Sequence, residues 1–107
     1  MKKLSMAPYP SRILLCSTRK EFLRVYRAMS GIHYPGVDAK GTMVELHHDR
    51  KGEIVALIHA SGAATLAHEF SHAILNTFER IGIDPREANG EPFCYMLSHL
   101  MEQAAKK

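Results

Sequence analysis

The sequence predicts a single α+β domain with the element order β-α-β-β-α-α and a small mixed sheet of three strands packed on helices. Three observations support this prediction: short β-rich runs at residues 11–17, 42–48 and 53–59, long stretches of helical periodicity, and glycines where that periodicity stops. With 107 residues, of which 46% are hydrophobic, the chain can build one hydrophobic core. We therefore expect one domain over residues 1–107, with a flexible N-terminus at residues 1–10.

The first half is predicted to hold one strand and one helix. The strand is the apolar run SRILLCS, residues 11–17. A helix should follow, because Thr18 is a preferred N-cap residue and Glu21, three residues later, completes a capping box. Its apolar residues recur at helical spacing and stop at Gly31, a residue type that commonly ends helices. The next segment contains Pro35 and two glycines without a sustained period, which is typical of a loop.

The second half is predicted to begin with a β-hairpin. Its strands are residues 42–48 and 53–59, and the sequence DRKG at 49–52 supplies the turn. The longest and most apolar helix is predicted over residues 63–81 and should be central. A last helix is expected from about residue 92 to residue 105.

Composition and charge narrow the classes of function. No apolar run approaches the roughly 20 residues of a membrane span, and the start MKKLSMAPYPS lacks the apolar stretch of a secretory signal. We therefore expect no membrane partner and a cytoplasmic location. The net charge is +3, and the basic residues of the first helix lack interleaved aromatic residues, so we expect no nucleic-acid partner.

The stretch LAHEFSHAIL, residues 66–75, carries the pattern His-Glu-x-x-His in the long predicted helix. On a helix, His68 and His72 project from one face about 6 Å apart, so their imidazoles can take two corners of a tetrahedral Zn²⁺ site. Glu69 is placed to act as a general base on a water that attacks a carbonyl carbon. The pattern predicts a zinc-dependent peptide-bond hydrolase. The competing interpretation is an ordinary amphipathic helix that carries two histidines.

A catalytic zinc site needs a third protein ligand. One version of the motif would place Gly and His at positions that are Leu75 and Phe78 here, which excludes that version. A carboxylate on the following helix remains, and Glu91 lies 19 residues after His72.

At this point the second half of the chain, roughly residues 53–102, resembles the gluzincins, in which His-Glu-x-x-His is followed about 20 residues later by a Glu on the next helix. It is most similar to the small single-domain gluzincin-like zinc metallopeptidases of bacteriophages and mobile elements, in which segments like GID and GEPFCY follow the motif. The resemblance implies a minimal zincin-like fold with the motif on the central helix. It implies the metal ligands His68, His72 and Glu91 and the base Glu69. It further implies that a peptide or protein substrate binds along strand 53–59, as an antiparallel edge strand, by strand addition.

Several alternatives stay open at this stage. Tyr95 stands where thermolysin-like enzymes carry an Asp; it is a candidate for orienting a histidine or stabilising an oxyanion, and equally for a core aromatic residue. Because Pro92 confines Glu91 to the very start of its helix, Glu87 and Cys94 are rival third ligands. The alternative function is a phage-type assembly or partner-binding protein with a structural or vestigial zinc site and no turnover. An exposed edge strand would also allow a homodimer.

Overall fold

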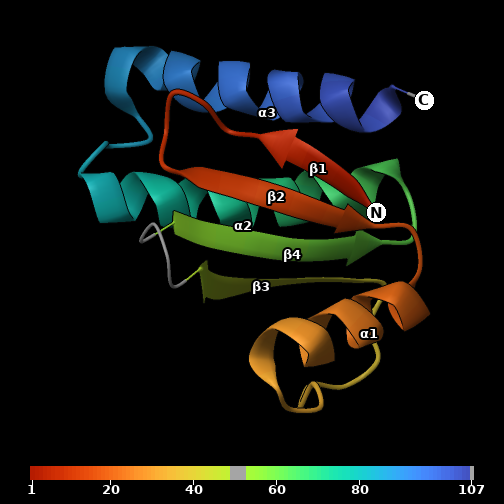
Figure 1. Ribbon diagram of the computed structural model, residues 1–107. Helices are drawn as coiled ribbons and strands as arrows, with labels where there is room; N and C mark the ends of the chain where they lie inside the picture. Colours follow the sequence, from red (N-terminus) through yellow and green to blue (C-terminus); the bar gives the residue numbers. More distant parts are fainter. Residues whose placement is uncertain (49–52, 107) are drawn as a thin grey trace.

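The computed structural model describes residues 1–48 and 53–106 and shows a four-stranded sheet with three α-helices (Figure 1). The strands are β1 (Lys2–Ser5), β2 (Ser11–Cys16), β3 (Gly41–His48) and β4 (Glu53–Ala60). The helices are α1 (Arg19–Ser30), α2 (Ala63–Ile81) and α3 (Glu91–Ala105), and a 3-10 turn at Glu87–Gly90 precedes α3. The predicted turn at residues 49–52 lies outside the described residues.

The sheet has the strand order β1-β2-β4-β3. β2 runs parallel to β4, whereas the β1–β2 and β3–β4 pairs are antiparallel, so the predicted α+β class and mixed sheet are confirmed. The prediction of three strands is wrong, because there is a fourth strand, β1. It lies within residues 1–10, the segment that was expected to be flexible, and it pairs with β2. Leu4 and Met6 of this segment are buried in the core, and this burial stabilises the added strand.

β4 is an interior strand, with β2 on one side and β3 on the other. The expectation that residues 53–59 form an edge strand is therefore wrong, because both backbone edges of β4 are already paired and cannot accept a further strand. The edges of the sheet are β1 and β3. Any strand addition in this domain has to use one of these two.

Helices cover the two faces of the sheet unequally. α2 and α3 pack on one face, and α1 packs on the other (Figure 1). Because side chains alternate along a strand, neighbouring residues of β4 serve different cores. The core under α2 and α3 includes Ile13, Ala56, Ile58, Phe70, Ile74, Phe78 and Leu100. The core under α1 consists of Leu14, Cys16, Phe22, Val55 and Leu57.

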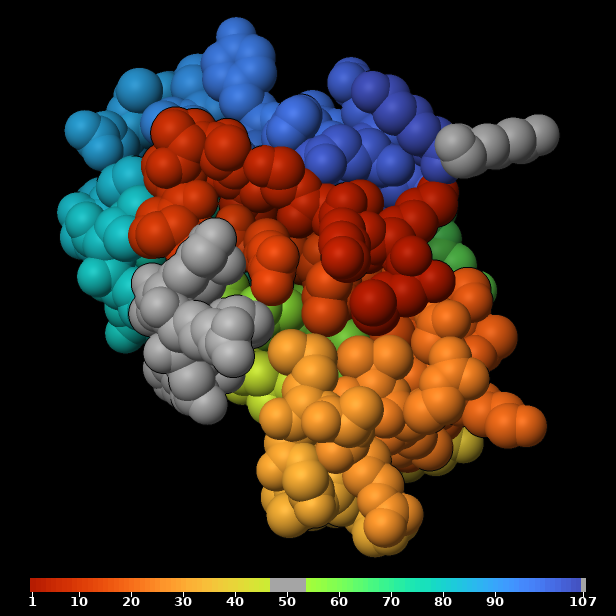
Figure 2. Space-filling view, viewed as in Figure 1, coloured from red at the N-terminus to blue at the C-terminus, as the bar shows by residue number. Residues whose placement is uncertain are grey.

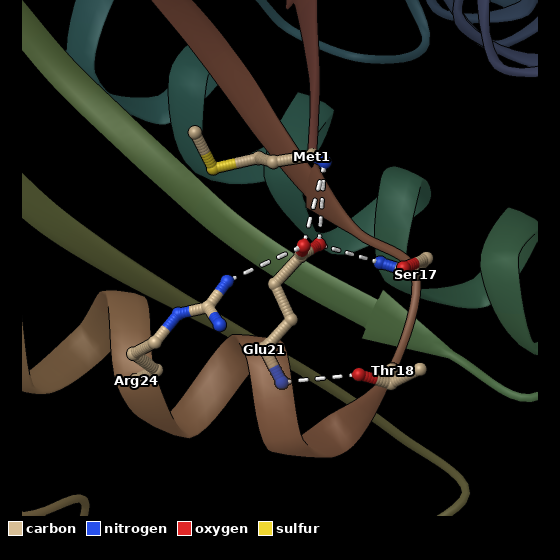
Figure 3. A network of polar contacts seen from close by, with 5 residues as sticks. All are labelled: Met1, Ser17, Thr18, Glu21 and Arg24. Atoms are coloured by element: carbon tan, nitrogen blue, oxygen red, sulfur yellow. Dashed lines mark hydrogen bonds and ion pairs between the residues drawn. The ribbon is translucent and has the colours of Figure 1, made fainter.

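α1 begins at the N-cap that the sequence predicts (Figure 3). The backbone N–H of Glu21 donates to Thr18 Oγ1 at 3.0 Å, which confirms Thr18 as the N-cap. The Glu21 carboxylate accepts from the N–H of Ser17 at 2.9 Å, one residue before the N-cap, rather than from Thr18 as a capping box would have it. The same carboxylate lies 3.4 Å from the Met1 ammonium group and 3.7 Å from the Arg24 guanidinium. The Ser17 N–H lowers the pKa of Glu21, and the Met1 ammonium lowers it further.

β1 also contacts the C-terminal end of α3. Lys2 Nζ donates to the Ala104 carbonyl oxygen at 2.6 Å, and Gln103 exchanges two hydrogen bonds of 2.9 Å with the Ser5 backbone. In Figure 2 the N-terminal residues, in red, lie directly against the C-terminal helix, in blue. Within the described residues, none of the helices is long and apolar enough to cross a membrane.

Candidate metal site and neighbouring groove

The His-Glu-x-x-His motif lies in the N-terminal half of α2. α2 packs through a face of large side chains that includes Phe70, Ile74 and Phe78. His68 and His72 lie on the opposite face and are exposed to solvent. Their Nε2 atoms are 3.1 Å apart, and the two rings are nearly perpendicular, at 82°. The two Nε2 atoms are thus within hydrogen-bond distance of each other on the exposed face of the helix.

This separation is a hydrogen-bond distance, and it is also close to the distance between two ligands of one zinc ion. Two nitrogen ligands at about 2.0–2.1 Å in a tetrahedral arrangement lie about 3.3 Å from each other. Without a metal, two Nε2 atoms at 3.1 Å need a proton on one ring and a lone pair on the other. The donor set and its spacing fit two ligands of Zn²⁺, and the exposed position leaves the other coordination directions open.

Glu69 takes a different direction from the histidines. Its side chain is only 8% exposed and lies on the sheet side of α2, beneath the start of β3. A methyl group built on Gly41 would stand 3.3 Å from Glu69 Cγ. Within the described residues, no side chain or backbone group forms a hydrogen bond or ion pair with the Glu69 carboxylate. The carboxylate oxygens are nevertheless not among the buried polar atoms that lack a partner in the described residues, so solvent can reach them.

Glu91 is not brought to the histidine pair. α3 runs back along α2 (Figure 1), and the two helices meet where the Phe78 and Phe93 ring centroids are 6.5 Å apart. His72 lies six residues before Phe78, about 9 Å along the helix axis, and Glu91 lies on the other side of this contact, about 3 Å further on. The two are thus separated by about 12 Å along the axis, because the phenylalanine contact fixes the register of the helices.

The rival ligands do not complete the site either. In residues 1–48 and 53–106, no third His, Cys, Asp or Glu joins the pair in a group that could hold a metal ion. Glu87, Cys94 and His99 are exposed at other positions on the 3-10 turn and α3. Tyr95 is 71% exposed, so it is a surface residue rather than the core aromatic considered from the sequence.

His59 lies on the other side of the sheet from His68 and His72. It is 5% exposed and packs against Phe22 of α1, with ring centroids 5.0 Å apart, and its Nε2 has no hydrogen-bond partner among the described residues. Burial lowers the pKa of His59, and the Arg19 guanidinium lowers it further, whereas Asp38 and Glu69 raise it. His59 therefore belongs to the α1 core, and it is held in the neutral form.

A groove between β3 and α2 was not predicted from the sequence. It has a volume of about 490 Å³ and is lined by Met43, Glu45, Asn76, Glu79 and Arg80. Asn76 and Glu79 follow His72 by four and seven residues, so they share its face of the helix. This spacing was the signal in the sequence that could have identified them.

No protein-family model matches the chain, and no curated protein or solved structure matches it. The site is therefore described by its own geometry.

Proposed function

We propose that this chain is a zinc-dependent hydrolase of peptide bonds that acts in the cytoplasm, as its resemblance to the gluzincin-like peptidases implies. His68 and His72 hold the metal ion in this proposal, and Glu69 is the general base. The observation that carries the proposal is the 3.1 Å separation of the two Nε2 atoms on the exposed face of α2.

The histidines supply two nitrogen donors that lie 3.1 Å apart. A bound zinc ion lowers the pKa of its water to about 7 and polarises the substrate carbonyl group. Because His68 and His72 are exposed, a peptide can approach the open coordination directions from solvent.

Glu69 handles the proton in this proposal. It directly follows His68 in the sequence, and its side chain lies beside the start of β3, the strand along which the substrate binds in this proposal. The carboxylate accepts a proton from the attacking water and passes it to the nitrogen of the leaving group. The absence of a hydrogen-bond partner among the described residues leaves its oxygen atoms free for this exchange.

The substrate binds along β3 rather than along residues 53–59. β3 is an edge strand of the sheet and lies beside α2, with Gly41 near Thr65 and Glu45 paired with Arg80. An extended peptide can therefore add to its free backbone groups and pass along the face of α2 that carries the histidines.

Metal content is the decisive first measurement. We expect close to one zinc ion per chain in the parent protein and a large loss in His72→Ala. His99→Ala is the matched control, because it removes an exposed histidine of α3 outside the pair. Glu91→Ala tests the predicted third ligand directly. A parent protein that holds no zinc after incubation with the metal would refute the proposal.

Turnover is tested with Glu69→Gln. This variant keeps the size of the side chain and should retain zinc, but hydrolysis of a peptide mixture should fall at least about 100-fold. Unchanged hydrolysis would exclude Glu69 as the base.

A second candidate function is a partner-binding protein that holds zinc without turnover. It is favoured by the finding that, in the part of the chain that the structure describes, no third ligand residue joins the pair. The missing ligand would then come from the partner. Zinc binding with no hydrolysis, in both the parent protein and Glu69→Gln, would support this function over the first.

A further inference from the structure

The groove between β3 and α2 continues the face of the helix that carries the metal pair. Asn76 and Glu79 lie one and two helical turns beyond His72, and Met43 and Glu45 line the groove from the strand. Met43 and Glu45 point to this side because alternate residues of a strand share a face. A peptide that adds to β3 would direct every second side chain toward the same groove.

The charges at the floor of the groove already satisfy one another. Arg80 Nη1 lies 2.5 Å from Glu45 Oε2, and Arg80 Nη2 donates to Ser11 Oγ at 2.8 Å and to Thr77 Oγ1 at 3.3 Å. The guanidinium is thus engaged on both of its terminal nitrogens, and its charge is compensated by Glu45.

Glu79 is the carboxylate that remains uncompensated. It is exposed, and within the described residues its side chain forms no hydrogen bond or ion pair; the same holds for Asn76. Next to them, Met43 offers a thioether and an apolar stem. The groove therefore combines an apolar wall with one free negative charge, a combination that suits a long side chain with a cationic end.

We propose that this groove binds a lysine or arginine side chain of the peptide that lies along β3, with the cationic group at Glu79. The inference rests on the proposed function, because it requires a peptide that binds along β3. It adds that this peptide carries a basic residue. Seven residues of helix separate Glu79 from His72, about 10 Å, which equals about three residues of extended chain. The basic residue thus lies about three residues from the bond that is cleaved.

The direction of the peptide follows from the strand. β3 and α2 run the same way, because Gly41 lies near Thr65 and Glu45 near Arg80. A peptide that pairs antiparallel to β3 passes Glu79 first and His72 afterwards. The basic residue is then on the N-terminal side of the cleaved bond.

Peptide binding to Glu69→Gln tests the inference without turnover. The probes are fluorescein-labelled nonapeptides of serine and threonine with a single lysine, norleucine or glutamate at the third position. We expect the lysine peptide to bind about two- to fivefold more tightly than the norleucine peptide, the range of an exposed ion pair. Adding Glu79→Gln should abolish this preference, and adding Glu79→Lys should make the glutamate peptide the preferred one. Glu102→Gln, an exposed glutamate of α3 outside the groove, is the matched control and should leave the preference unchanged.

Three results would overturn the inference: equal binding of the lysine and norleucine peptides, a preference that survives Glu79→Gln, or a preference that Glu102→Gln also removes. Zinc content, measured on the same samples, separates this outcome from failure of the proposed function. Zinc without a lysine preference refutes the inference alone, whereas a lysine preference without zinc refutes the metal site alone.

Discussion

Gly41 controls how closely β3 approaches α2, and its replacement by alanine gives a sharp test of the packing around Glu69. A Cβ atom at this position would stand 2.4 Å from Thr65 Cγ2 and 3.3 Å from Glu69 Cγ, whereas ordinary contacts begin at 3.4 Å. The overlap with the threonine methyl group is thus about 1 Å. Thr65 is β-branched and sits on a helix, so it has few rotamers into which it can move.

Two terms set the expected magnitude for Gly41→Ala. Overpacking of this kind costs about 1–3 kcal/mol, and reduced freedom of the unfolded chain returns about 0.4–1 kcal/mol. We expect the free energy of unfolding to fall by about 1–2 kcal/mol. With a urea dependence of about 1–2 kcal/mol per molar for a small domain, the midpoint of unfolding shifts by about 1 M.

Thr65→Ser provides the control, because it removes Cγ2 and keeps the hydroxyl group. In this background Gly41→Ala should cost clearly less, although the contacts of 3.3 Å with Glu69 Cγ and the His59 carbonyl oxygen remain, and the double-mutant cycle should give a coupling energy of about 1 kcal/mol. Urea unfolding followed by circular dichroism measures all four proteins. An equal loss of stability in both backgrounds would refute the assignment of the cost to the Thr65 methyl group.

Three further predictions concern the core under α1 and the start of that helix. The pKa of His59 is lowered in the folded protein, so the unfolded chain binds the proton first as the pH falls. The free energy of unfolding should therefore decrease as the pH drops below about 6.5. In urea titrations of His59→Gln, this decrease should be absent. Burial raises the pKa of Cys16 to about 11, so a thiol reagent at pH 8 should label Cys94 rapidly and Cys16 slowly, and Cys94→Ser should remove the fast phase. Thr18→Ala should destabilise the protein by about 0.5–2 kcal/mol through loss of the N-cap, whereas Thr18→Ser should be nearly neutral in the same unfolding assay.

The helices and the paired strands could be predicted because their signals are local. The N-cap at Thr18 stands where the sequence predicts it. The glycines that end α1 and α2, Gly31 and Gly82, also stand where the sequence predicts them, and both have φ of 79°. β1 was missed because a four-residue strand that begins with two lysines carries little periodicity. The interior position of β4 was missed because its parallel pairing with β2 depends on segments far apart in the sequence.

The candidate site also has some features that depend on one local segment and others that depend on segments far apart in the sequence. The spacing of His68 and His72 is a property of one helix, and the sequence was sufficient to place them on one face. The distance of Glu91 from the pair depends on the register of α3 against α2, which the contact of Phe78 with Phe93 sets. The groove beside the pair needs both the position of β3 and the Glu45–Arg80 ion pair, and neither is encoded locally.

The hydrogen bonds between β1 and the end of α3 join residues that are 98 positions apart in the sequence. Closing so long a loop costs more conformational entropy than any local turn, so we expect this junction to form late in folding and to open first in the native state. Hydrogen exchange should then be faster for the amides of β1 than for those of β4. Such an opening would uncover the outer edge of β2 and leave α2 packed on the sheet, so the domain can lose its first strand while His68 and His72 stay together.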